Sequence, residues 1–130
     1  MQPGKYILYA DDDSDDRNWV NDACKGIDGS LKVHFLENGR EVLEHLSNDL
    51  QNLPSLIVLD LNMPELDGRQ TLQRLKSNTN FKKIPVVIVT TSSNKMDQEI
   101  CKKLGADLYL IKPDTHQAWQ NIAKQLQVFL

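Results

Sequence analysis

Residues 56–60 read Leu-Ile-Val-Leu-Asp, a run of four apolar residues that ends directly in a carboxylate. Short apolar runs of this kind are typical of strands buried on both faces, as in a parallel sheet covered by helices. Three more runs have the same character, whereas residues 32–36 alternate polar and apolar side chains as an edge strand does. The sequence therefore predicts one edge strand and four buried strands, at 6–10, 56–59, 86–89 and 108–111.

Apolar residues with helical spacing fill the five stretches that follow the predicted strands. Glycines stand where helices should begin or end, with Gly39 and Gly68 at two entries and Gly105 after the fourth helix. We expect Ser14 to cap the first helix. The resulting order, βαβαβαβαβα, indicates right-handed crossovers and an α/β fold with a parallel sheet between helices.

The chain has 130 residues, a formal net charge of -3 and 40% hydrophobic residues, which predicts one soluble globular domain over 1–130. Mild acidity argues against a nucleic-acid binder and against a basic membrane-surface helix. No apolar run approaches the ~18 residues of a membrane span. Cys24 and Cys101 are isolated, which favours reduced thiols and a cytoplasmic location.

Acidic residues are concentrated at one place, because five of the 18 lie within residues 11–16. In open α/β sheets the binding crevice lies beyond the carboxyl ends of the strands. Carboxylates that meet there repel one another, so either the pKa of one of them is raised or the group binds a cation. Mg²⁺ favours carboxylates together with a phosphate oxygen. The sequence contains neither G-x-x-x-x-G-K-[ST] nor G-x-G-x-x-G. Polar residues follow four strands and are expected to meet at one edge: Asp11-Asp12-Asp13, Asp60-Leu61-Asn62, Thr90-Thr91 and Lys112-Pro113.

The segment 59–68, Leu-Asp-Leu-Asn-Met-Pro-Glu-Leu-Asp-Gly, resembles the phosphoacceptor segment of response-regulator receiver domains, the CheY-like family of two-component signalling. Four further features match that family in order and spacing. They are the acidic pair Asp11-Asp12, the switch hydroxyl Thr90, the switch aromatic Tyr109, and Lys112 with its following proline. The resemblance implies a three-layer (βα)5, flavodoxin-like fold, in which a doubly wound parallel sheet has five strands in the order 2-1-3-4-5.

The same resemblance assigns roles to the site residues. Asp60 would accept a phosphoryl group from a sensor histidine kinase or a phosphotransfer protein. Mg²⁺, with Mn²⁺ as an alternative ion, would be held by Asp12, Asp60 and the backbone carbonyl of Asn62, with Asp11 acting through a coordinated water. Thr90, the Thr91 amide and Lys112 would bind the phosphoryl group, while Tyr109 would turn inward and change the protein-binding surface. A cis peptide at Lys112-Pro113 would aim the ammonium inward.

The family resemblance further implies a stand-alone receiver domain without an output domain, which signals through a downstream protein target. It would be no enzyme beyond its own phosphotransfer and dephosphorylation. The last helix, 115–130, carries only Lys124 as a formal charge, and its apolar residues Trp119, Phe129 and Leu130 predict a homodimer contact. Asp13, Asp15 and Asp16 are interpreted as solvent-facing acids at a helix entry, where the helix dipole favours them.

Two other functions and one other kind of site fit these residues less well. An aspartate-nucleophile phosphatase needs D-x-D-x-[TV], but 60–62 lacks the second aspartate and 11–15 lacks the Thr or Val. A calcium loop that starts at Asp11 would place Asp16 where glycine is required. A receiver-like interaction module that acts without phosphorylation would typically have lost an acid or the lysine, and here none is missing.

Overall fold

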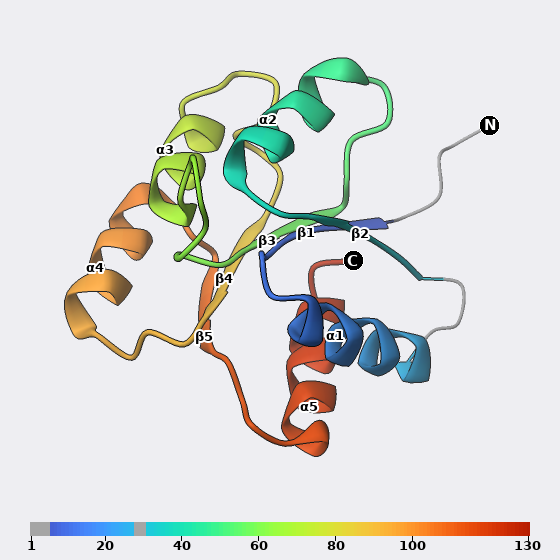
Figure 1. The fold of residues 1–130 in the computed structure, drawn as a ribbon. Coiled ribbons are helices and arrows are strands. Elements are labelled where there is room, and N and C mark those ends of the chain that lie inside the picture. The colour runs from blue at the N-terminus through green and yellow to red at the C-terminus, as the bar shows by residue number, and fades with distance from the viewer. Residues whose placement is uncertain (1–5, 28–30) are drawn as a thin grey trace.

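The computed structural model describes residues 6–27 and 31–130, which form a five-stranded parallel sheet between two layers of helices (Figure 1). The strand order is β2-β1-β3-β4-β5, so the predicted fold class and strand order are confirmed. The elements are β1 (Tyr6–Ala10), α1 (Ser14–Ile27), β2 (Lys32–Leu36), α2 (Gly39–Asn48), β3 (Leu56–Leu59), α3 (Gly68–Lys76), β4 (Val86–Thr90), α4 (Lys95–Leu104), β5 (Leu108–Ile111) and α5 (His116–Gln127).

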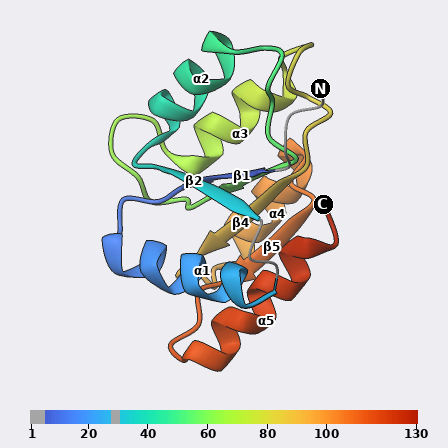
Figure 2. The same cartoon turned by 90° about the vertical axis from the view of Figure 1, so that its right-hand side faces the viewer.

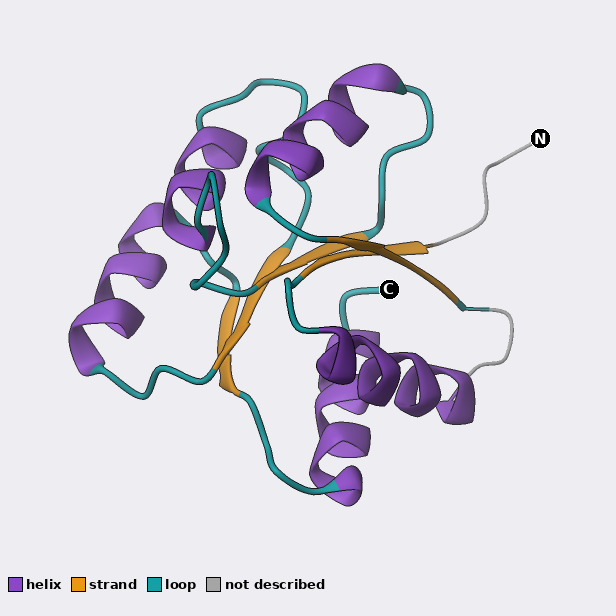
Figure 3. Ribbon diagram, viewed as in Figure 1, coloured by secondary structure: helices purple, strands orange, loops and turns teal. Residues whose placement is uncertain are grey.

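The helices divide unequally between the faces of the sheet. Helices α1 and α5 pack together on one face, and α2, α3 and α4 lie side by side on the other, as Figures 2 and 3 show from two directions. Successive residues of a strand point to opposite faces. Leu8 and Ile57 therefore belong to the core under α2 and α3, while Ile7 and Val58 belong to the core under α1 and α5. Both cores exclude water completely at these positions, which explains the continuous apolar runs.

Strand β5 differs from its predicted character. The run 108–111 was expected to be buried on both faces, but its first three residues are only partly buried and Ile111 is 42% exposed. The cause is position, because β5 pairs only with β4 and forms the second edge of the sheet. The prediction of a buried strand was wrong here, although the strand itself has the predicted bounds.

The N-terminus of α1 is capped by Asp13 and not by Ser14. The Asp13 carboxylate accepts hydrogen bonds from the backbone N–H groups of Asp15 at 2.9 Å and Asp16 at 3.3 Å. Ser14 is already the first helical residue, so its side chain cannot serve that role. The prediction of Ser14 as the cap was therefore wrong, and Asp13 is an exposed residue that caps the helix. The predicted glycine positions at the starts of α2 and α3 and after α4 are confirmed.

The two tryptophans lie in different environments. Trp119 of α5 is buried in the core beneath α1 and α5, whereas Trp19 of α1 is 39% exposed and its ring lies 5.3 Å from that of His116. Within residues 6–27 and 31–130, no helix combines the length and the apolar character that crossing a bilayer requires.

Two glycine-to-alanine substitutions should act on stability in opposite directions. A Cβ at Gly39 would overlap the Thr71 hydroxyl and lie 2.8 Å from the Leu66 carbonyl oxygen, where α2 meets α3. Such overpacking should lower the free energy of unfolding of Gly39→Ala by about 1–3 kcal/mol. Gly26 of α1 has open space around it, and Gly26→Ala should raise that free energy by about 0.5–1 kcal/mol because alanine favours the helix.

Urea denaturation followed by circular dichroism measures both effects. A Gly39→Ala protein as stable as the wild type would show that α2 and α3 can separate without loss, contrary to the packing described above.

Candidate functional site

The carboxyl edge of the sheet brings together polar residues from four strands. The parallel hydrogen-bond ladder continues past the apolar runs, because the Asp11 amide donates to the Leu36 carbonyl at 3.0 Å and the Asp60 amide donates to the Ala10 carbonyl at 3.1 Å. On the other side, the Lys112 amide donates to the Thr90 carbonyl at 2.8 Å. The backbone that carries these side chains is thereby fixed by the sheet itself.

The Lys112 ammonium is the centre of the site. Its Nζ lies 2.8 Å from Asp60 Oδ2, 2.9 Å from Asp11 Oδ2 and 2.6 Å from Asp16 Oδ2, and only 7% of its side chain is exposed. Burial disfavours the charge of Lys112, but its close contacts with the three carboxylates outweigh this effect and raise its pKa. Lys112 is therefore held as a cation among carboxylates that follow β1 and β3 and one in the first turn of α1.

Asp11 is the most deeply buried acid of the group. Burial raises its pKa to about 6, although Lys112 and the backbone amide of Asp13 oppose that shift. Asp11 Oδ1 accepts the Asp13 amide at 2.9 Å, whereas Oδ2 is buried and, among the described residues, receives no hydrogen bond of good geometry despite the nearby ammonium. A buried carboxylate oxygen that accepts no hydrogen bond can still bind a cation.

A divalent cation fits the acidic residues at this edge. Asp11, Asp12 and Asp60 each offer an oxygen, and these three atoms lie within 4.8 Å of one another. Asp12 is exposed while the other two are buried, so the group is open on one side. Asn62 lies beside it, with its backbone amide donating to Asp60 Oδ1 at 3.2 Å and its side chain exposed. Carboxylate oxygens with room for water are ligands that suit Mg²⁺ or Mn²⁺.

The loop after β4 contains the two threonines and meets Tyr109. Thr90 is buried at the end of β4, while Thr91 is exposed. Tyr109 of β5 is half-buried, and its hydroxyl donates to the carbonyl oxygen of Ser92 at 2.8 Å. Tyr109 is thus hydrogen-bonded to the backbone two residues beyond Thr90.

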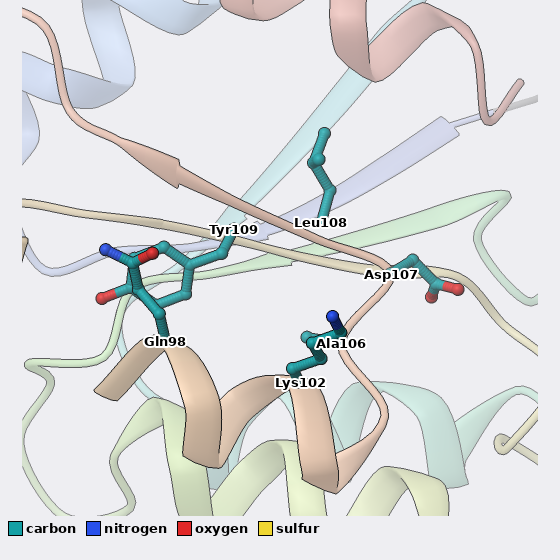
Figure 4. Close-up of a pocket in the computed structure, with 6 residues that line it drawn as sticks. All are labelled: Gln98, Lys102, Ala106, Asp107, Leu108 and Tyr109. Carbon is teal, nitrogen blue, oxygen red and sulfur yellow. The ribbon is translucent and has the colours of Figure 1, made fainter. Parts of the chain in front are cut away.

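Side chains of α3 and α4 hold the same loop from its other side. The Ser92 hydroxyl donates to Asp97 Oδ2 at 2.7 Å, and Asp97 Oδ1 pairs with Arg69 of α3 at 2.5 Å. Beyond this link, α4 and β5 form a shallow hollow, with Gln98 and Tyr109 at one end and Asp107 at the other (Figure 4). It is also lined by Lys102, Ala106 and Leu108.

Two predictions about the site were wrong. Asp16 was interpreted as a solvated residue of the helix entry, yet its carboxylate makes the shortest contact to Lys112. Its position in the first turn of α1, next to the end of β1, was the only sequence signal for this role. The Lys112–Pro113 peptide is trans, since the described residues contain no cis peptide bond. The long lysine side chain reaches all three carboxylates without one.

Comparison with known proteins agrees with this geometry. Residues 7–124 match the family model of the response regulator receiver domain. The response regulator Rcp1 of Synechocystis sp. is 35% identical over 114 residues, which cover 85% of this chain and 78% of Rcp1.

Two crystal structures share the fold closely. The phosphorylated cyanobacterial phytochrome response regulator RcpA superposes with a TM-score of 0.88 at 29% identity, covering 96% of this chain and 92% of RcpA. The Mn²⁺-bound form of Rcp1 superposes with a TM-score of 0.86 at 30% identity, covering 97% and 94%. The chain therefore belongs to the response regulator receiver domain family, the signalling domains of two-component systems.

Proposed function

We propose that Asp60 accepts a phosphoryl group from a phosphohistidine of a sensor histidine kinase or phosphotransfer protein, and that this modification changes a protein-binding surface. An oxygen of the Asp60 carboxylate would attack phosphorus, and the bond from phosphorus to the histidine nitrogen would break with its electron pair on nitrogen. The observation that carries the proposal is the 2.8 Å contact between Lys112 Nζ and Asp60 Oδ2 at the end of a buried strand.

Phosphoryl transfer depends mainly on positioning and on compensation of negative charge. Lys112 has three N–H donors, and the one directed at Asp60 would pass to a phosphoryl oxygen. The Thr90 hydroxyl and the exposed Thr91 amide lie at the end of the neighbouring strand, where they would serve as further donors. The backbone ladder keeps Asp60 and Lys112 in register while this occurs.

We further propose that Mg²⁺, or Mn²⁺ in its place, is held by Asp11, Asp12 and Asp60 with the backbone carbonyl of Asn62. The close approach of three carboxylate oxygens and the buried Asp11 oxygen without a hydrogen bond support this assignment. The bound ion would supply positive charge to the phosphoryl oxygens.

The output is proposed to arise from the loop after β4. Movement of Thr90 toward a phosphoryl group would pull the backbone at Ser92, and the Tyr109 hydroxyl bonds to that carbonyl. The face made by α4, β5 and α5, including the hollow in Figure 4, would change its shape for a downstream target. A module that acts without phosphorylation is the alternative, but the complete set of Asp11, Asp12, Asp60 and Lys112 favours the phosphorylated switch.

Phosphorylation can be tested with acetyl phosphate and Mg²⁺, followed by mass mapping of the acid-stable, base-labile adduct. We expect one phosphoryl group on Asp60, and none in Asp60→Asn or after removal of the metal by a chelator. Asp67→Asn, which alters an acid at the N-cap of α3, is the matched control and should keep the adduct. Absence of an adduct in the wild type would favour the phosphate-independent module, and repeated turnover of small phosphate esters would favour a phosphatase.

The pKa of Asp11 predicts a pH dependence of stability in the metal-free protein. Because the folded state raises this pKa from 3.8 to about 6, folding binds a proton, and the stabilisation is fully present below about pH 4 and lost as the pH rises through 6. Relative to Asp11→Asn, the wild type should lose up to about 3 kcal/mol between those limits. Urea denaturation in the presence of a chelator measures this difference.

Asp22→Asn controls for the loss of one negative charge, since Asp22 is exposed on α1. A difference between wild type and Asp11→Asn that is the same at pH 4 and pH 7 would contradict the burial argument.

Dimerisation through the last helix stays a prediction, with one correction. Trp119 was expected to supply an apolar contact, but it is 2% exposed and belongs to the core. Phe129 and Leu130, which were expected to join it, are partly buried and pack against the same core. The exposed apolar residues near this face are Val128, which is 83% exposed, and Trp19 of the adjacent α1. Sedimentation with and without beryllofluoride should show a dimer that Val128→Asp weakens. Monomers alone in both conditions would end this proposal.

A further inference from the structure

Three carboxylates in the described part of the chain form ion pairs with Lys112, and Asp16 is the one of them to which the proposed phosphoacceptor chemistry gives no role. It lies in the first turn of α1, on a different element from Asp11 and Asp60, and its carboxylate is 2.6 Å from the ammonium. Its side chain is 18% exposed, so solvent screens this ion pair less than an exposed one. Asp16 is also not among the carboxylates whose oxygens gather closely enough to share a metal ion.

The contacts of Lys112 show why this residue should matter. Its ammonium has three N–H donors, and three carboxylates already lie within 2.9 Å of it. A phosphoryl group on Asp60 brings more negative charge to the same cation. Asp16 and the phosphoryl group would then compete for one ammonium, while Asp16 simultaneously offsets the positive charge that Lys112 presents to a metal ion.

We propose that Asp16 is a positioning residue of the phosphoacceptor site, which holds Lys112 from the α1 side in competition with the phosphoryl group and so balances metal affinity against phosphoryl affinity. This inference rests on the proposed function of Asp60. Asp16 acts only through Lys112 and touches neither the phosphoryl group nor the ion.

The proposal predicts effects of opposite sign from one substitution. Asp16→Asn keeps the size of the side chain but removes its charge, so Lys112 is freer to bind a phosphoryl oxygen and repels a divalent cation more strongly. We expect the affinity for beryllofluoride, measured at saturating Mg²⁺, to increase about three- to ten-fold, and the affinity for Mn²⁺ to decrease by a similar factor. Damage to the fold would instead weaken both.

Asp15→Asn is the matched control. Asp15 occupies the same first turn of α1 and carries the same charge, but it is exposed and its side chain makes no ion pair among the described residues. Both substitutions remove one favourable interaction with the helix dipole, so their general effects should be equal. Asp16→Glu keeps the charge on a side chain that is one methylene longer, so it can still reach Lys112. Both affinities of this variant should remain close to those of the wild type.

Calorimetric titration of Mn²⁺ and of beryllofluoride into the wild type and these three variants tests the proposal. Equal shifts in Asp16→Asn and Asp15→Asn would show a general charge effect and overturn it, as would a loss of both affinities in Asp16→Asn alone. If the wild type forms no Asp60 adduct and binds no beryllofluoride, the proposed function is overturned. The proposed competition between Asp16 and the phosphoryl group is then overturned as well. A wild type that is phosphorylated, with Asp16→Asn unchanged in both affinities, would overturn this inference alone.

Discussion

A single buried ammonium, that of Lys112, organises the functional edge of this protein. Taking a charge out of water is costly, and it is tolerated here because carboxylates from β1, α1 and β3 surround it. Asp11 and Asp16 come from one segment, Asp60 from a second and Lys112 from a third, so the pairing requires β1, α1, β3 and β5 to be correctly placed at the same time. Removing one partner of such a group leaves a buried charge that the remaining structure compensates less well.

The two sides of the site are held by different kinds of hydrogen bond. Asp11, Asp60 and Lys112 extend the ladder of the sheet through their backbone amides. The loop after β4 is held differently, by the Tyr109 hydroxyl on one side and by the Asp97 carboxylate on the other. Side-chain hydrogen bonds of this kind can be exchanged without breaking the sheet, which makes this loop the natural place for a conformational response.

Much of the fold and the centre of the site could be predicted because both follow from the periodicity of the strands. Runs such as 56–59 are apolar since they are covered on both faces, and the residue that follows each run must lie at the carboxyl edge. This reasoning locates Asp11, Asp60, Thr90 and Lys112. It cannot locate Asp16, because its contact depends on how the first turn of a helix faces back toward a strand end.

The remaining departures have similar tertiary causes. An apolar run does not reveal whether a strand has one neighbour or two, so β5 was expected to be more buried than it is. Consecutive acids at a helix entry all suit its dipole, and only the folded structure shows that the Asp13 carboxylate accepts the backbone N–H groups that cap α1. Trp119 was expected at a homodimer contact, but the packing of α5 on the sheet places it in the core.

The backbone hydrogen bonds of Asp11, Asp60 and Lys112 also affect how often the site opens while the rest of the domain stays folded. Amides in a central parallel sheet exchange with solvent mainly when the whole domain unfolds, whereas loop amides exchange through small fluctuations. The amides of these three residues belong to the ladder, while the exposed backbone around Thr91 does not. We therefore expect the charged centre to open less often than the loop beside it.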